Sequence, residues 1–296
     1  MSAPIDARSL HPFPGWVSGL LVLATFGMLT WLETRRPLRS SRQKKLARNA
    51  RNLAIAGLSA AAIRAAELPV VLSLSGWVEQ RRWGLLKLVD VPLWLELAAA
   101  VVLLDYTLFV WHVLTHKVPL LWRFHQAHHV DLDMDASTAL RFHFGEMLLS
   151  VPWRAGQVLL IGASPLALSL WQTATVLEIL FHHSNVEIPW TVERRLCWFL
   201  VTPRMHGIHH SIIHDETDSN WSTIFSFPDF LHGTVRLNVP HDAITIGIPA
   251  YQDAAELTLP KVLALPLRKQ RPSWKLLSDQ EPRRSTPALP RTRLAG

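Results

Sequence analysis

The strongest constraint on the fold is an uncharged stretch of 18 residues, Gly15 to Leu32, which follows Pro14 and precedes a basic segment. A helix of that length nearly spans the hydrocarbon core of a bilayer, which is about 30 Å thick. A secretory signal peptide carries its positive charge before the apolar core, whereas here the positive charge follows it. We therefore predict a transmembrane helix that stays in the mature protein.

Three further apolar stretches predict additional membrane segments. The second covers residues 52–77, where Arg64 and Glu67 lie three residues apart and can pair on one helix face inside a bundle. The third covers residues 92–116. The fourth stretch, residues 146–181, is too long for one crossing. An Ala-Ser-Pro break near its middle predicts a helical hairpin or a re-entrant pair. The alternative is a soluble all-helical core with unusually hydrophobic helices.

Positive charge is concentrated in two segments. Residues 35–51 hold eight Lys or Arg and no acid, and residues 261–296 hold nine against two acids. Because no nucleic-acid-binding motif accompanies these runs, nucleic acid is not an expected partner. Basic flanks favour the cytoplasmic side of a membrane. Counting crossings from there places the N-terminus outside and the histidine-rich segments on the cytoplasmic side of the inner (cell) membrane.

Histidine is the most unusual part of the composition. Of 15 histidines, 14 lie after residue 110, and Cys197 is the single cysteine. One cysteine excludes an intrachain disulfide framework, a four-cysteine zinc ribbon and a ferredoxin cluster. The chemistry of this chain is therefore expected from imidazole groups in its second half.

Eight of these histidines recur at spacings of three and four residues. They are His112 and His116, then His125, His128 and His129, then His206, His209 and His210. Residues at these spacings share one helix face, so each cluster can direct its rings at a metal ion. Eight imidazoles exceed the coordination number of one ion, which predicts two metals. Imidazole suits Fe, Zn, Cu and Ni, and packing or helix capping is the alternative for any single pair.

Two carboxylates lie at helical spacing from these histidines. Asp105 precedes His112 by seven residues, and Glu146 follows His143 by three. Either carboxylate can accept a ring N–H and so fix the tautomer of a metal ligand. For Asp105 the alternative is a role in solvating a helix near the membrane interface.

The histidine clusters are joined by further motifs: RFHFGE at 141–146, HSN at 183–185, ETDSNW at 216–221 and DFLHGT at 229–234. From about residue 33 to residue 235 the pattern resembles the fatty acid hydroxylase superfamily, also called the sterol desaturase family. Members are integral-membrane, O2-dependent di-iron enzymes that hydroxylate or desaturate lipids. The resemblance implies two Fe ions per chain.

By position the resemblance implies nine metal ligands, namely His112, His116, His125, His128, His129, His183, His206, His209 and His210. His182 is the alternative to His183 because either ring of the pair can point inward. His143 matches a motif histidine that is a further ligand or supports one. No catalytic side chain is expected beyond the metal centre.

Four other residues near the motifs are candidates for contact with the site. His214 follows His210 by four residues and either faces the site or lies in solvent. Asn185, Asp218 and Asn220 are expected to hydrogen-bond ligands or loop backbone, and ordinary turn or cap roles explain each of them equally well.

The expected fold is all-α, an integral-membrane helical bundle with a cytoplasmic, histidine-rich di-metal cap. The expected division is an N-terminal segment (1–14), a membrane-embedded catalytic domain (15–240) and a basic, Pro- and Arg-rich tail (241–296), with about the last 35 residues disordered or on a membrane surface.

The expected reaction is hydroxylation or desaturation of a fatty acyl or sterol-like lipid. Its partners are the membrane lipid, O2 and an external electron donor, either a ferredoxin or a cytochrome b5-like protein with its reductase. The alternatives are oxidative ether-lipid cleavage or carotenoid oxidation by the same centre, and a membrane metal-binding or transport protein.

Overall fold

The computed structural model describes residues 7–284, and within them the regular structure is helical, with only isolated β-bridges. The longer helices are α1 (Gly15–Arg35), α2 (Lys45–Ala62), α3 (Leu68–Arg81), α4 (Leu93–Lys117), α5 (Pro119–His129), α6 (Phe144–Ile161) and α7 (Pro165–His183). The shorter ones are α8 (Trp190–Leu196), α9 (Pro203–His209), α10 (His214–Thr217), α11 (Phe227–His232) and α12 (Leu259–Ala264). The predicted all-α class is confirmed.

Single turns connect these helices. They are η1 (Ala7–Leu10), η2 (Ile63–Glu67), η3 (Leu85–Lys87), η4 (Thr138–Leu140), η5 (His241–Ala243), η6 (Pro249–Tyr251), η7 (Ala254–Glu256) and η8 (Leu265–Leu267). All are 3-10 turns except η2, which is a π-helical turn that joins α2 to α3.

Three helical segments are long and apolar enough to cross a membrane: Gly15–Arg35, Lys45–Lys87 and Leu93–Lys117. They match the three predicted spans, of which the third begins one residue later than predicted. Large apolar side chains point outward from the first, where Trp16 is 71% and Leu23 is 70% exposed. An apolar outer surface of this kind suits lipid rather than water, because a soluble protein rarely leaves such a surface uncovered.

The fourth apolar stretch forms two helices, as predicted. Gly162 ends α6 in the left-handed region at φ 81°, and a Cβ there would lie 2.7 Å from the Trp83 carbonyl oxygen, so the close turn requires glycine. Ser164 then caps α7 by accepting a hydrogen bond from Ala167 N–H.

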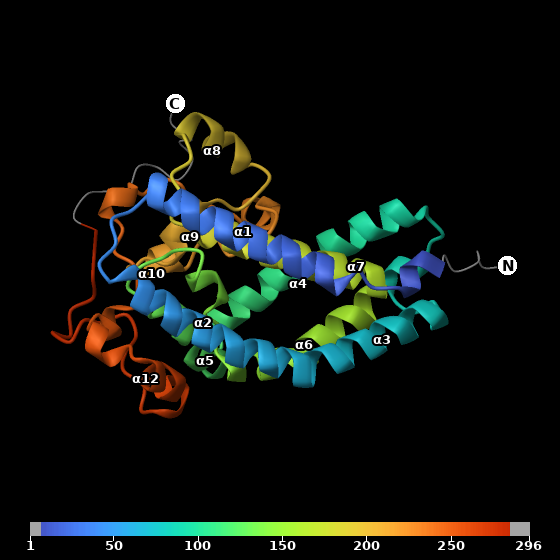
Figure 1. Cartoon of the computed structure of the whole chain (residues 1–296), viewed down its shortest axis with the longest axis horizontal. Helices are drawn as coiled ribbons and strands as arrows, with labels where there is room; N and C mark the ends of the chain where they lie inside the picture. The colour runs from blue at the N-terminus through green and yellow to red at the C-terminus, as the bar shows by residue number, and fades with distance from the viewer. Residues whose placement is uncertain (1–6, 285–296) are drawn as a thin grey trace.

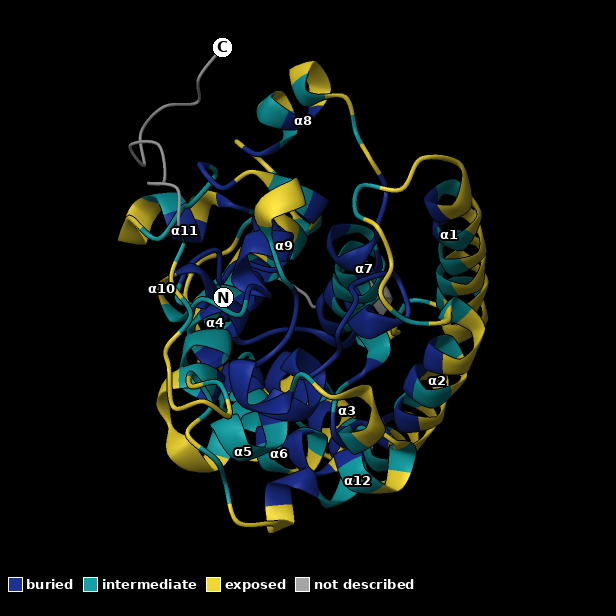
Figure 2. Ribbon diagram, turned by 90° about the vertical axis from the view of Figure 1, so that its left-hand side faces the viewer, coloured by how far each residue is buried: buried dark blue, intermediate teal, exposed yellow. Residues whose placement is uncertain are grey.

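The long helices pack along one direction. α7 contacts α1 and α4, and α6 contacts α2 and α3. Figure 1 shows these helices along the long axis, with α8, α9, α10 and α12 gathered at the end away from the N-terminus. Figure 2, which looks onto that end, shows buried segments in the centre and exposed ones on the outer sides of α1 and α2.

The expected pairing of Arg64 with Glu67 is wrong. The π-helical turn η2 separates the two side chains, so that Glu67 is buried and Arg64 is exposed, and the two do not form an ion pair. Among the described residues, the Glu67 carboxylate lies instead 3.4 Å from the Ser150 hydroxyl oxygen.

The segment expected to be a basic tail begins with a packed part, so the expectation that about the last 35 residues are disordered is wrong for Val262 and Leu265. Tyr251, Leu257 and Val262 are buried in one apolar cluster with Ile55 of α2 and Ala127 of α5. Because these apolar residues are spaced along a Pro- and Arg-rich segment, its composition did not indicate that they would pack. Residues 285–296 lie outside the described part of the chain, as do residues 1–6 of the N-terminal segment.

The basic run 35–51 is also partly internal. Arg48 is 3% exposed, lies 2.9 Å from the Asp131 carboxylate and pairs with Asp135. Burial raises the pKa of Asp131, but Arg48, Arg141 and Arg51 outweigh it and hold that pKa at about 2. Part of this positive charge therefore neutralises buried acids in the loop after α5.

Candidate metal centre

Eight histidines from four helices, together with His210 directly after α9, converge at the end of the bundle where α4, α5, α7 and α9 meet. They form three overlapping groups in which the ligand atoms lie within 4.8 Å of one another: His112, His116, His125 and His129; His128, His183, His206 and His210; His129, His209 and His210. These are the nine residues that the motifs indicated. Their role as metal ligands stays a prediction.

In the second group, neighbouring ring nitrogens lie within hydrogen-bond distance of each other. The His183 Nε2 atom lies 3.0 Å from His128 Nε2 and 3.0 Å from His206 Nε2, and His206 Nε2 lies 3.2 Å from His210 Nε2. A neutral imidazole carries a single N–H, so the ring nitrogen of His206 cannot donate to both neighbours. A cation between these four nitrogens would satisfy all of them.

Backbone carbonyls fix the orientation of several rings. The Nδ1–H groups of His112, His183 and His209 donate to the carbonyls of Trp221 (2.7 Å), Ile179 (2.8 Å) and Ser219 (2.9 Å). A carbonyl only accepts, so each bond sets the tautomer and leaves the Nε2 lone pair for another partner.

A carboxylate does the same for His125. Glu146 Oε1 lies 2.9 Å from His125 Nδ1, and the buried Nε2 of His125 has no hydrogen-bond partner among the described residues. The expected contact of Glu146 with the centre is present, although its partner is His125 and not its sequence neighbour His143.

Burial keeps five of the nine rings neutral. It lowers the pKa of His209 to about 3, and together with neighbouring histidines it holds the pKa values of His128, His129, His206 and His210 well below the ordinary range. A neutral imidazole is the form that binds a metal ion.

The donor set fits metal cations. Buried nitrogens with no partner in the described residues include His129 Nε2, His209 Nε2 and both ring nitrogens of His116. An unsatisfied buried polar atom costs about 1–3 kcal/mol, so several such nitrogens in one place fit a site that holds a cation. Neutral nitrogen ligands in overlapping groups suit a pair of divalent ions.

Asp105 does not contact a histidine, contrary to the expectation that it accepts a ring N–H. It is fully buried, and its carboxylate accepts from the backbone N–H groups of Ile224 (3.1 Å) and Phe225 (3.0 Å). It therefore anchors the loop that carries Trp221, the residue whose carbonyl orients His112.

His143 and His182 lie outside the three groups. His143 caps α6, because its Nδ1 accepts from Gly145 N–H at 2.9 Å while its Nε2–H donates to the Leu263 carbonyl at 3.1 Å. His182 donates to the Thr223 carbonyl at 3.1 Å, and its ring lies 4.1 Å from that of His206. The geometry thus favours His183 over His182.

The four remaining candidates support loops or lie at the surface. Asn185 accepts from Arg39 N–H at 2.9 Å, and Asn220, at φ 53°, donates to the Met205 carbonyl at 2.8 Å. His214 stacks on Trp274 and lies 3.4 Å from Asp218, which pairs with Lys117. The possibility that His214 faces the site is wrong.

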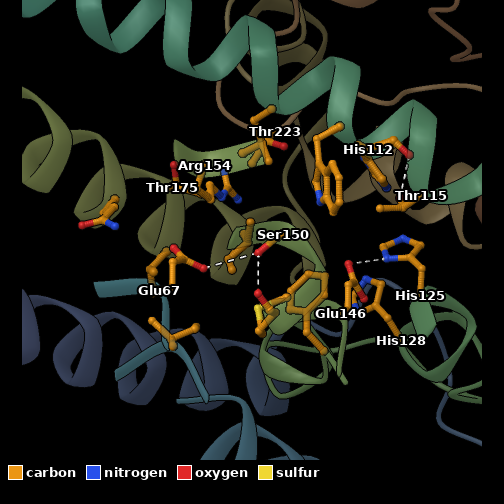
Figure 3. A pocket seen from close by; sticks show the side chains of 18 of the residues that line it. Glu67, His112, Thr115, His125, His128, Glu146, Ser150, Arg154, Thr175 and Thr223 are labelled. Carbon is orange, nitrogen blue, oxygen red and sulfur yellow. Dashed lines mark hydrogen bonds and ion pairs between the residues drawn. The ribbon is translucent and has the colours of Figure 1, made fainter. Parts of the chain in front are cut away.

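A cavity of about 370 Å³ opens beside the histidines. Trp111, Phe142 and Trp171 form apolar parts of its wall, and His112, His125 and His128 line one side (Figure 3). Glu67 and Arg154 also line it, and this position was not predicted from the sequence. The sequence signal that could have indicated these two residues is a charged side chain within each of two apolar stretches.

These features define a helical protein with apolar spans and a histidine-lined site that can hold metal next to an apolar cavity. Residues 97–234 match the fatty acid hydroxylase family model. Over this segment, which is just under half of its length, the chain is therefore similar to the fatty acid hydroxylase, or sterol desaturase, family.

Individual relatives agree with this family. A cholesterol 25-hydroxylase-like protein of Danio rerio is 31% identical over 48% of this chain and 55% of its own length. The ornithine lipid hydroxylase OlsE of Rhizobium tropici is 32% identical over 53% of this chain and 46% of its own length. Methylsterol monooxygenase 1-3 of Arabidopsis thaliana is 27% identical over 44% of each chain. The chain thus spans about half the length of these curated relatives. No solved structure matches it.

Proposed function

We propose that this protein is a membrane-bound, O2-dependent lipid hydroxylase with two iron ions per chain. The observation that carries the proposal is the convergence of nine histidines next to an apolar cavity in a chain that matches the fatty acid hydroxylase family model. The relatives' names, which include sterol and lipid hydroxylases, support a lipid substrate.

The choice of iron rests on the ligand chemistry and the family. Imidazole nitrogen is a good ligand for iron, and nine neutral ligands leave two divalent ions with nearly their full charge. When bound, iron would supply the activation of O2 and the removal of hydrogen from an unactivated C–H bond. Hydroxylation converts the substrate C–H, O2, two electrons and two protons to C–OH and water.

The protein's own residues would hold and shape this centre. Glu146 and the carbonyls of Trp221, Ile179 and Ser219 keep the ligand rings in one orientation. Phe142 stacks on His128 with ring centroids 4.5 Å apart. The apolar wall of the cavity, to which Phe142 belongs, keeps water from the reacting carbon and positions the substrate chain beside the histidines.

Electrons would come from a separate protein. The buried Cys197 offers no site for an iron–sulfur cluster, and the sequence carries no dinucleotide-binding motif. We propose a ferredoxin or a cytochrome b5-like protein with its reductase as donor. We further propose that residues 15–240 form the catalytic domain, with the histidines on the cytoplasmic side of the inner membrane and the N-terminus outside.

The first test is metal content with Mössbauer spectroscopy on protein purified in detergent after growth with labelled iron. About two coupled irons per chain are expected, and lipids from cells with and without the protein should then differ by an added oxygen. Zinc alone, or one metal per chain after anaerobic preparation, would contradict the proposal and favour metal handling.

A further inference from the structure

The cavity beside the histidines carries opposite charges at its other end. Glu67 and Arg154 line it together with Ser150, and most of the remaining wall is apolar. Figure 3 draws Glu67 and Arg154 on one side of Ser150, with His125 on the other side. Because charges within membrane segments are costly, a pair facing a cavity calls for a functional reason.

A backbone irregularity directs Glu67 into this cavity. Pro69 cannot donate a backbone hydrogen bond, and the turn before it is π-helical, with Leu68 N–H bonded to the Ile63 carbonyl five residues back. The inserted residue shifts the helical phase, so Glu67 is only 7% exposed while Arg64 faces outward. Turns of this kind are frequent at functional sites.

The Glu67 carboxylate is weakly satisfied within the described part of the chain. Its partner, the Ser150 hydroxyl, lies 3.4 Å away and also lies 2.7 Å from the Met147 carbonyl. A hydroxyl has one proton, so the shorter bond to Met147 takes it. The carboxylate therefore has acceptor capacity to spare.

Arg154 is held nearby without neutralising Glu67 directly. Its guanidinium donates to Gln157 at 3.0 Å and lies over the Trp171 ring at 5.1 Å from the centroid. Glu67 and Arg154, both in the described part of the chain, form no ion pair with each other. An acceptor and a donor thus face the same cavity, and their formal charges cancel.

We infer that this end of the cavity binds the hydroxyl group of a neutral lipid alcohol. Such a hydroxyl donates to Glu67 and accepts from Arg154, whereas Glu67 repels a carboxylate and Arg154 repels an ammonium group. The alcohol group is thereby held at one end while a distant carbon lies beside the histidines. The inference rests on the proposed function only in taking the histidine end as the place of oxidation.

Binding of chain-matched probes to the full protein in lipid nanodiscs tests this directly. Radiolabelled hexadecan-1-ol is displaced by hexadecane, hexadecanoic acid, hexadecylamine or N-hexadecylglycine, each corrected for partition into the bilayer. The alcohol should bind roughly ten- to a hundredfold more tightly than the hydrocarbon, the range expected for hydrogen bonds to charged groups. Equal binding of all probes, or tightest binding of the zwitterionic glycine, would overturn the inference.

Two variants should change the preference in opposite directions. Glu67→Gln leaves a net positive charge, so it should favour the acid over the alcohol, and Arg154→Met should favour the amine. Arg64→Gln, on the same helical segment but exposed, is the matched control and should keep the wild-type order. Identical selectivity in all of these proteins would refute the role of Glu67 and Arg154. If a variant does not fold, the order in which the wild-type protein binds the probes still decides the test.

Binding is measured without O2 or reductant, so it does not depend on turnover. Selectivity for the alcohol without any oxidised product would leave the binding site in place and contradict the proposed hydroxylase. Oxidised lipid without selectivity for the alcohol would support the proposed hydroxylase and contradict the alcohol-binding site.

Discussion

Glu146 Oε1 lies 2.9 Å from His125 Nδ1, and each of the two side chains is only 3% exposed. The contact joins α6 to α5 and directs the free Nε2 of His125 toward His112, His116 and His129. A buried carboxylate in this position orients a ligand and increases its basicity.

Replacing Glu146 by Gln should therefore weaken metal binding without removing a ligand. We expect metal affinity to fall about 10–100-fold, the usual effect of losing a partner that orients a metal-binding histidine. Iron retention against a graded chelator series measures it. Glu256→Gln, which changes an exposed ion pair with Arg271, is the control. Equal iron retention in both variants would show that Glu146 does not orient a ligand.

Two histidines five residues apart provide a direct test of the ligand assignment. His209→Ala should abolish activity and lower the metal content, because His209 is fully buried within the histidine groups. His214→Ala should leave both unchanged, because His214 stacks on Trp274 at the surface. Membrane insertion should be normal in both. Full activity of His209→Ala would exclude this residue as an essential ligand.

The folded C-terminal segment should contribute measurably to stability. Leu257 is 1% exposed and packs in the cluster with Ile55 and Ala127, so Leu257→Ala should cost about 2–5 kcal/mol. Leu277, at 80% exposure, gives a control variant, Leu277→Ala, with little expected effect. Thermal unfolding in detergent distinguishes the two. A tail without packing would give the same result for both substitutions.

His241 should contribute to the loss of stability in weak acid. Burial, with Arg39 and Arg204 nearby, lowers its pKa to about 2, whereas an unfolded histidine titrates near 6.5. Below about pH 6.5 the unfolded chain therefore takes up a proton that the folded one does not, so stability falls with falling pH. His241→Gln should remove roughly 1 kcal/mol of the stability change between pH 7 and pH 5.5. An unchanged pH slope for this variant in denaturant titrations would contradict the assignment.

The helices and the histidine set could be predicted because their signals are local. Apolar length predicts a span, and histidines three and four residues apart share a face wherever the helix lies. His183 came from the family motif, and the structure brings it to His128 and His206.

Features that depend on tertiary partners could not be predicted in this way. Asp105 is near His112 on one helix, yet its partners are backbone N–H groups of residues 224 and 225. Arg48 belongs to a run that looks like a membrane flank, but it pairs with Asp131 and Asp135. The π-helical turn that separates Arg64 from Glu67 leaves no signal beyond Pro69.

The packing of the C-terminal segment on α5 also sets an order of events during synthesis. α5 carries His125, His128 and His129, and its Ala127 lies in one buried apolar cluster with Val262 and Leu265. While a ribosome is still producing residues before about 265, this face of α5 has no cover. The packing around α5 can therefore be completed only after the residues up to about 265 have been made.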